Sequence, residues 1–161
     1  MIHYPFILCL AASSTQANQI VDHLKLENFS KNHISTLLVD QSQNYERGGA
    51  ENLKTSESEL EGPWRYIAGT GERIKSGAGF FIAAGPIIPI MNHAKIGMAF
   101  GGVCSGLIRM GIPLIEAKNY EEKILKGNIL LSVEIRKSAE IYRAKNIFKD
   151  AEAFNIFAMG A

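Results

Sequence analysis

The pattern of apolar and polar positions near the start of the chain predicts a strand, a helix and a second strand. Residues 5–11 (PFILCLA) are apolar at every position, as expected of a strand that is covered on both faces. Ser13 then offers a helix cap, with Gln16 at capping-box spacing. The apolar positions of this helix recur with helical period: Ala17, Ile20, Val21 and Leu24. Residues 34–39 (ISTLLV) predict the second strand and complete a first β-α-β half over residues 1–40.

The last third of the chain, residues 111–161, repeats this scheme after one additional helix. Pro113 suits the first position of that helix, whose inner face would carry Ala117, Tyr120 and Ile124. Residues 129–135 alternate as a strand does, with four apolar side chains on one face: Ile129, Leu131, Val133 and Ile135. Ser138 can cap the next helix, with an expected buried face of Ile141, Ala144 and Phe148. Residues 154–159 (FNIFAM) then form the closing strand.

Two β-α-β halves in one chain predict an α+β fold of the ferredoxin-like type. In that β-α-β/β-α-β sandwich, one antiparallel sheet carries its helices on one face. The chain of 161 residues suits a single domain over 1–161. Between the halves, residues 41–75 are polar and read as a surface loop.

Residues 76–110 form a Gly-rich apolar insert between the halves. Two apolar arms flank the polar tip Asn92 to Lys95, a pattern that predicts a helical hairpin. Pro86 and Pro89 should break or kink the first arm. Each arm is shorter than the roughly 20 apolar residues that a membrane-spanning helix needs. A full membrane crossing is therefore not expected.

The glycines of the second arm are spaced for close helix packing. Gly97 and Gly101 are four residues apart, as are Gly102 and Gly106. Glycine costs about 1 kcal/mol relative to alanine inside a helix, so four glycines in one arm need a compensating contact. Small residues at this spacing allow two backbones to approach closely. A partner protein, a shallow membrane insertion and an intramolecular cover for the sheet all remain open as the packing surface.

Composition and charge narrow the function classes. The net charge is +1 with 20% charged residues, which gives no basic patch for nucleic acid. Cys9 and Cys104 both fall in apolar segments and read as buried thiols of a cytoplasmic protein. The four histidines lack metal-ligand spacing, and neither a metal nor another cofactor is expected. Glu121 and Glu122 diverge on a helix and are expected on a solvated face.

Several segments together resemble a known family. They are FIAAGPII (81–88), GMAFGGVCSGLIRMGIP (97–113), EAKNYEEKI (116–124) and KGNILLSVEI (126–135). The chain is similar here to the bacterial general-stress or heat-induced stress protein domains, Gly-rich proteins of unknown function with a ferredoxin-like core. The resemblance implies a small cytoplasmic or membrane-associated stress protein without assigned chemistry. Where relatives carry a longer Gly/Ala-rich run before the AAGP element, residues 59–77 are polar and charged.

The expected function is that of a non-enzymatic, stress-associated interaction protein. It would self-assemble into a homo-oligomer through the Gly-rich hairpin, without nucleic acid. The residues expected to carry the assembly are Gly85, Pro86, Gly97, Gly101, Gly102, Gly106, Gly111, Pro113 and Tyr120. Two alternatives from other classes are a small-molecule-binding regulatory domain, argued by fold analogy, and peripheral membrane association through the same hairpin, which is not favoured.

Overall fold

The structure is a computed structural model that describes residues 5–39, 72–76, 79–94 and 102–158. Its strands are β1 (Phe6–Ala11), β2 (Ile34–Val39), β3 (Glu72–Ser76), β4 (Gly79–Ala84), β5 (Ile129–Glu134) and β6 (Phe154–Ala158). Its α-helices are α1 (Ser14–Leu26), α4 (Ile87–Ala94), α5 (Gly102–Arg109), α6 (Leu114–Leu125) and α7 (Ser138–Asp150). A short 3-10 helix, η1 (Lys31–His33), leads into β2.

The described strands form one antiparallel sheet in the order β3-β4-β2-β5-β1-β6. β5 lies between β1 and β2, and β1 lies between β5 and β6, so the two β-α-β units interleave. The β3-β4 hairpin extends the sheet beyond β2. The predicted α+β class with an antiparallel sheet is therefore confirmed.

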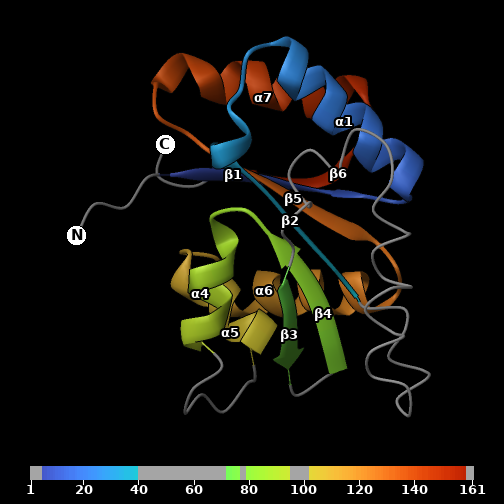
Figure 1. The fold of residues 1–161 in the computed structure, drawn as a ribbon, viewed down its shortest axis with the longest axis vertical. Helices are drawn as coiled ribbons and strands as arrows, with labels where there is room; N and C mark the ends of the chain where they lie inside the picture. Colours follow the sequence, from blue (N-terminus) through green and yellow to red (C-terminus); the bar gives the residue numbers. More distant parts are fainter. Residues whose placement is uncertain (1–4, 40–71, 77–78, 95–101, 159–161) are drawn as a thin grey trace.

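Helices cover both faces of the sheet, whereas the ferredoxin-like pattern predicted helices on one face. In Figure 1, α1 and α7 form one layer, and α4, α5 and α6 lie on the opposite side of the sheet. The physical reason is that the central strands are apolar on both faces. All six residues of β1 and all six of β2 are buried. A sheet of this kind exposes apolar side chains to water unless helices or other elements cover both of its faces.

Two hydrophobic cores result from this arrangement, one on each face. Alternate residues of β5 divide between them, because successive side chains of a strand point to opposite faces. Leu131 belongs to the core beneath α1 and α7, and Leu130 to the core beneath α4, α5 and α6. The predicted apolar face of β5 is confirmed, since all four of its members lie in the first core: Ile129, Leu131, Val133 and Ile135.

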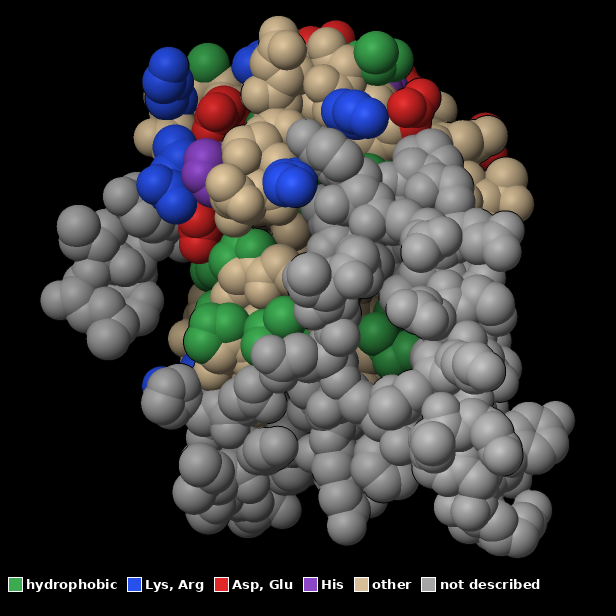
Figure 2. Space-filling model, viewed as in Figure 1, with side chains coloured by type: hydrophobic (Ala, Val, Ile, Leu, Met, Phe, Trp, Pro, Cys, Tyr) green, Lys and Arg blue, Asp and Glu red, His purple; other side chains and the backbone are tan. Residues whose placement is uncertain are grey.

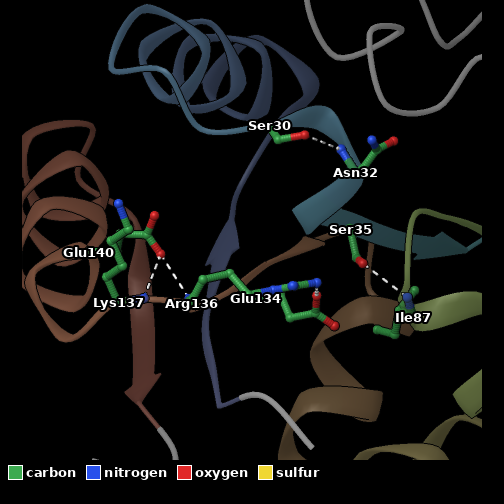
Figure 3. Close-up of polar contacts among 8 residues, drawn as sticks. All are labelled: Ser30, Asn32, Ser35, Ile87, Glu134, Arg136, Lys137 and Glu140. Atoms are coloured by element: carbon green, nitrogen blue, oxygen red, sulfur yellow. Dashed lines mark hydrogen bonds and ion pairs between the residues drawn. The ribbon is translucent and has the colours of Figure 1, made fainter. Parts of the chain in front are cut away.

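The helix starts follow local hydrogen bonding. The Ser13 hydroxyl accepts from the Gln16 N–H, and the predicted stripe of α1 is fully buried, so both predictions are confirmed. For α7 the prediction of Ser138 as the cap is wrong. Lys137 holds the cap position, and Glu140 Oε1 accepts from the backbone N–H groups of Arg136 and Lys137 (Figure 3). The Glu140 carboxylate, in the first turn of α7, thus takes the capping role that was predicted for the Ser138 hydroxyl.

Two segments between the halves differ from the prediction. The expected polar loop over residues 41–75 includes most of β3, although residues 40–71 lie outside the described residues. The expected helical hairpin over residues 76–110 begins instead with strand β4, which pairs with β2. The sequence GFFIAA is a short apolar run, and an open sheet edge beside β2 favours it as a strand. In the later part of this segment the described residues form the helices α4 and α5, which pack against each other.

Candidate interaction site: the α4–α5 hairpin and the β6 edge

The start of α4 is built against strand β2. Gly85 has φ +89°, and a Cβ there would overlap the carbonyl oxygen of Ile34 and lie 2.8 Å from Ser35 Cα. Only glycine combines this φ with so close an approach to backbone. The buried Ser35 Oγ accepts from the Ile87 N–H at 3.0 Å, and Figure 3 shows this bond between neighbouring elements. Gly85 therefore brings α4 onto its own sheet.

The first arm is interrupted as predicted, since β4 ends at Ala84 and α4 begins at Ile87, although neither proline kinks the interior of a helix. Pro86 lies just before α4 and Pro89 in its first turn. Proline is tolerated there, because the first N–H groups of a helix have no partner inside the helix. The Ile87 and Ile88 N–H groups are bonded to Ser35 Oγ and to the Gly85 carbonyl, respectively. The polar groups at the start of α4 are thus satisfied by the fold.

The close approach predicted from the glycine spacing occurs inside the chain at Gly106. A Cβ on Gly106 would overlap the Met91 sulfur and lie 2.8 Å from its Cε, so α4 sits directly on this face of α5. Met91, Val103 and Leu107 are buried in the core beneath these helices. Of the three packing surfaces that the sequence left open, the described part of the hairpin uses the intramolecular one.

The other glycines that were predicted to carry the assembly, and Pro113, lie at helix ends or outside the described residues. Gly111 has φ +108° and ends α5, where the Ile112 N–H bonds to the Leu107 carbonyl. Gly102 is the first residue of α5. Gly97 and Gly101 lie outside the described residues. Pro113 takes the cap position of α6, one residue before the predicted one. The assembly role of these residues stays a prediction.

Tyr120 connects α6 to the edge strand β6. Its side chain is 2% exposed, and its hydroxyl donates to the backbone carbonyl of Asn155. Burial, followed by the nearby Cys9 and Glu116, raises the pKa of the Tyr120 hydroxyl. The hydroxyl therefore stays protonated and remains a hydrogen-bond donor. The predicted inner face of α6 is confirmed at all three positions: Ala117, Tyr120 and Ile124.

The Asn155 carbonyl belongs to a bulge in β6. Leu10 pairs with Phe154 and Leu8 with Phe157, so Cys9 faces two residues of β6. Asn155, one of those two, has φ +51°, a conformation that asparagine tolerates better than most residues. The extra residue turns its carbonyl toward Tyr120. Residue-level prediction missed this site, since only an asparagine inside the run FNIFA hinted at an irregular strand.

β6 is an edge strand without charged residues. On its outer side the described residues place no further strand. Its apolar residues Phe154, Ile156 and Phe157 are half-buried, and Ala158 is exposed. The opposite edge strand, β3, carries Glu72, Arg73 and Lys75 within five residues. Charges are a common protection of sheet edges against pairing with another chain, and β6 lacks it.

The layer of α1 and α7 carries many charged side chains. Figure 2 shows Lys, Arg, Asp and Glu side chains over this upper part of the described surface. Arg143 connects the two helices there: it pairs with Glu27 at 3.3 Å and lies over the Phe29 ring. Glu134 and Arg136 form a second ion pair at 2.7 Å (Figure 3).

The expectation of a solvated face for Glu121 is wrong, whereas Glu122 is exposed as expected. Glu121 lies against α5, and burial raises the pKa of its carboxyl group, although the Cys104 backbone N–H partly offsets this. Its Oε2 is buried without a hydrogen-bond partner, as is the hydroxyl of Ser105. Helical spacing could not reveal this contact, because it arises only when α5 folds onto α6.

Cys104, beside Glu121, is buried, as the sequence analysis predicted for both cysteines. Burial and then the Glu121 carboxylate raise the pKa of its thiol, while Lys118 lowers it. Burial likewise raises the pKa of the Cys9 thiol. Protonated, buried thiols are poor nucleophiles.

In the described part of the chain, no helix is both long and apolar enough to cross a membrane. The same residues contain no cluster of three or more His, Cys, Asp or Glu that could hold a metal ion. No protein-family model, curated protein or solved structure matches the chain.

Proposed function

We propose that this protein is a non-enzymatic interaction protein that self-associates, and that its open sheet edge takes part in this association. The observation that carries the proposal is the contrast between the two edges of the sheet. β3 carries three charged residues, whereas β6 carries none and leaves apolar side chains half-exposed. An uncharged apolar edge offers unpaired backbone groups to another chain.

The proposal shifts the expected contact away from the glycine face of α5. Met91 already covers Gly106, so this face is not free for a second molecule. Assembly through the hairpin would therefore have to use residues other than Gly106. Association through the β6 edge does not require the Gly106 face to be uncovered.

We further propose that the core of the fold is ferredoxin-like. The order β2-β5-β1-β6, with α1 and α7 on one face, supports this classification. β3, β4, α4, α5 and α6 would then be additions to that core. A role in stress and a cytoplasmic location belong to the same proposal. The family resemblance supports the stress role, and the two free, buried cysteines support the location.

Size-exclusion chromatography with light scattering of the full chain tests self-association directly. We expect the weight-average mass to exceed 17.7 kDa and to rise with protein concentration. A mass that stays at the monomer value across the accessible concentrations would contradict the proposed function.

A further inference from the structure

We propose that two copies of this chain pair through β6, edge to edge and antiparallel about a two-fold axis. This inference rests on the self-association proposed above and names its surface and partner. Every neighbouring pair of described strands is antiparallel. A two-fold axis perpendicular to the sheet places β6 antiparallel to its own copy and so continues the same pattern. Such a contact uses one patch on both subunits and closes after two copies.

The charge distribution favours a second copy as the partner. Two-fold antiparallel pairing centred on the middle residue of a five-residue strand places the second position of one copy opposite the fourth position of the other, so basic residues at both positions would repel each other. β6 (FNIFA) contains no charged residue and avoids this repulsion. β3 (ERIKS) has a basic residue at the second and fourth of its five positions. Of the two edges, β6 is the one that can pair with its own copy without an electrostatic cost.

The apolar side chains of β6 are incompletely covered on both faces of the sheet. Ile156 packs against the core beneath α1 and α7, whereas Phe154 and Phe157 pack against the opposite core. Each of the three remains half-buried in the single chain. A second β6 would bring the same apolar side chains alongside on both faces. Each core would then continue across the two-fold axis, and the apolar surface of β6 that is exposed in the single chain would be buried.

The bulge determines which part of β6 is available. The Asn155 carbonyl accepts from the Tyr120 hydroxyl and so is turned away from the outer edge. Ile156 is the second residue of the bulge, and beyond it the strand regains a regular register, with Phe157 opposite Leu8 and Ala158 opposite Ile7. We therefore assign the pairing to residues 156–158. Tyr120 is a positioning residue for this segment, because it fixes the bulge from the buried side.

Ala158→Lys tests the surface with little risk to the fold, because Ala158 is exposed. Like charges brought together across the axis should weaken the dimer by roughly tenfold or more. Tyr142→Lys is the matched control, since Tyr142 is 72% exposed on α7 and its change should leave the dimer unaltered. The readout is light scattering over a concentration series, with circular dichroism to show that both variants stay folded.

Cross-linking gives a second, independent readout. The two native cysteines are buried, so a cysteine introduced at Ala158 offers an accessible thiol. A bismaleimide that spans about two to four residues of strand, roughly 7–14 Å, should link Ala158→Cys chains into dimers. The Tyr142→Cys control should stay monomeric under the same conditions.

The outcomes separate the two proposals. A monomeric wild type overturns both. A wild-type dimer that survives Ala158→Lys, or that gives no cross-link at Ala158→Cys, overturns the β6 pairing and leaves self-association standing. Equal cross-linking at positions 142 and 158 would indicate random collision and would also overturn the pairing.

Discussion

Gly85 and Gly127 both adopt the left-handed conformation, with φ of +89° and +109°, but their surroundings differ. A Cβ at Gly127 would have no neighbour within 4 Å, whereas one at Gly85 would overlap the Ile34 carbonyl oxygen. Glycine is thus required at Gly127 by conformation alone, and at Gly85 by conformation and space.

This difference predicts unequal effects of alanine at the two glycines. Gly127→Ala should cost about 1–2 kcal/mol of the free energy of unfolding, the cost of a left-handed L-residue. Gly85→Ala should cost more, by about 1–3 kcal/mol, because backbone atoms of β2 would have to move. Urea denaturation of both variants measures the difference. Equal losses would mean that α4 is not held against β2 as described.

Glu121 lies in an environment that its sequence context did not predict, because its Oε2 atom is buried. Its folded-state pKa is raised above the ordinary value of 4.5, mainly by burial. The folded state therefore binds the proton more tightly than the unfolded state does. The stability that this group contributes is present below pH 4.5 and is lost as the pH rises through the folded-state pKa.

Glu121→Gln should remove this pH dependence. Relative to wild type, the variant should gain stability as the pH rises above 4.5, the ordinary pKa of the carboxyl group, because an amide carries no charge to desolvate. Glu122→Gln, at the exposed neighbouring position, is the control. Urea denaturation at several pH values measures both variants. A Glu121→Gln advantage that shrinks toward neutral pH would contradict the buried placement of the carboxyl group.

At the scale of elements, the contact between α6 and β6 connects packing to the proposed function. Tyr120 lies in the predicted core face of its helix, but its hydroxyl also holds the bulge at Asn155. A helix on one face of the sheet therefore controls the shape of an edge strand distant from it in sequence.

Tyr120→Phe tests this control. Loss of the hydroxyl leaves the part-buried Asn155 carbonyl without its donor, which should cost about 1–3 kcal/mol of the free energy of unfolding. Amide hydrogen exchange in β6 should also become faster. Tyr142→Phe removes the same atom from an exposed side chain and should change stability by less than about 0.5 kcal/mol. If the two variants behave alike, the hydroxyl has no role at the bulge.

The elements that the sequence predicted well are those with strong local signals. α1, with its cap and apolar stripe, and β2, with its β-branched run, agree with their predicted positions. β4 was mistaken for part of a helical arm because a six-residue apolar run has no decisive period. Its identity as a strand follows from a pairing partner, β2, whose paired residues lie 42 to 48 positions earlier in the chain, from Val39 opposite Phe81 to Thr36 opposite Ala84.

For the whole molecule, the number of covered faces decides the architecture. The helices of two β-α-β halves alone would cover one face of the sheet. The apolar side chains on the other face would then be exposed to water. The Gly-rich hairpin and α6 cover that second face and build a core of their own. With both faces covered, the edges are the part of the sheet that the described residues leave open to another chain.

The sequence by itself determined the α+β class, most helices and strands, and the apolar positions of the cores, because period and capping are local properties. Only the tertiary structure decided which surface the glycines contact, why Glu121 is half-buried, and where β6 bulges. These features depend on segments far apart in the chain coming together, and no local pattern encodes the partner. The same holds for the contrast between the two sheet edges, since an edge exists only once the strand order is set.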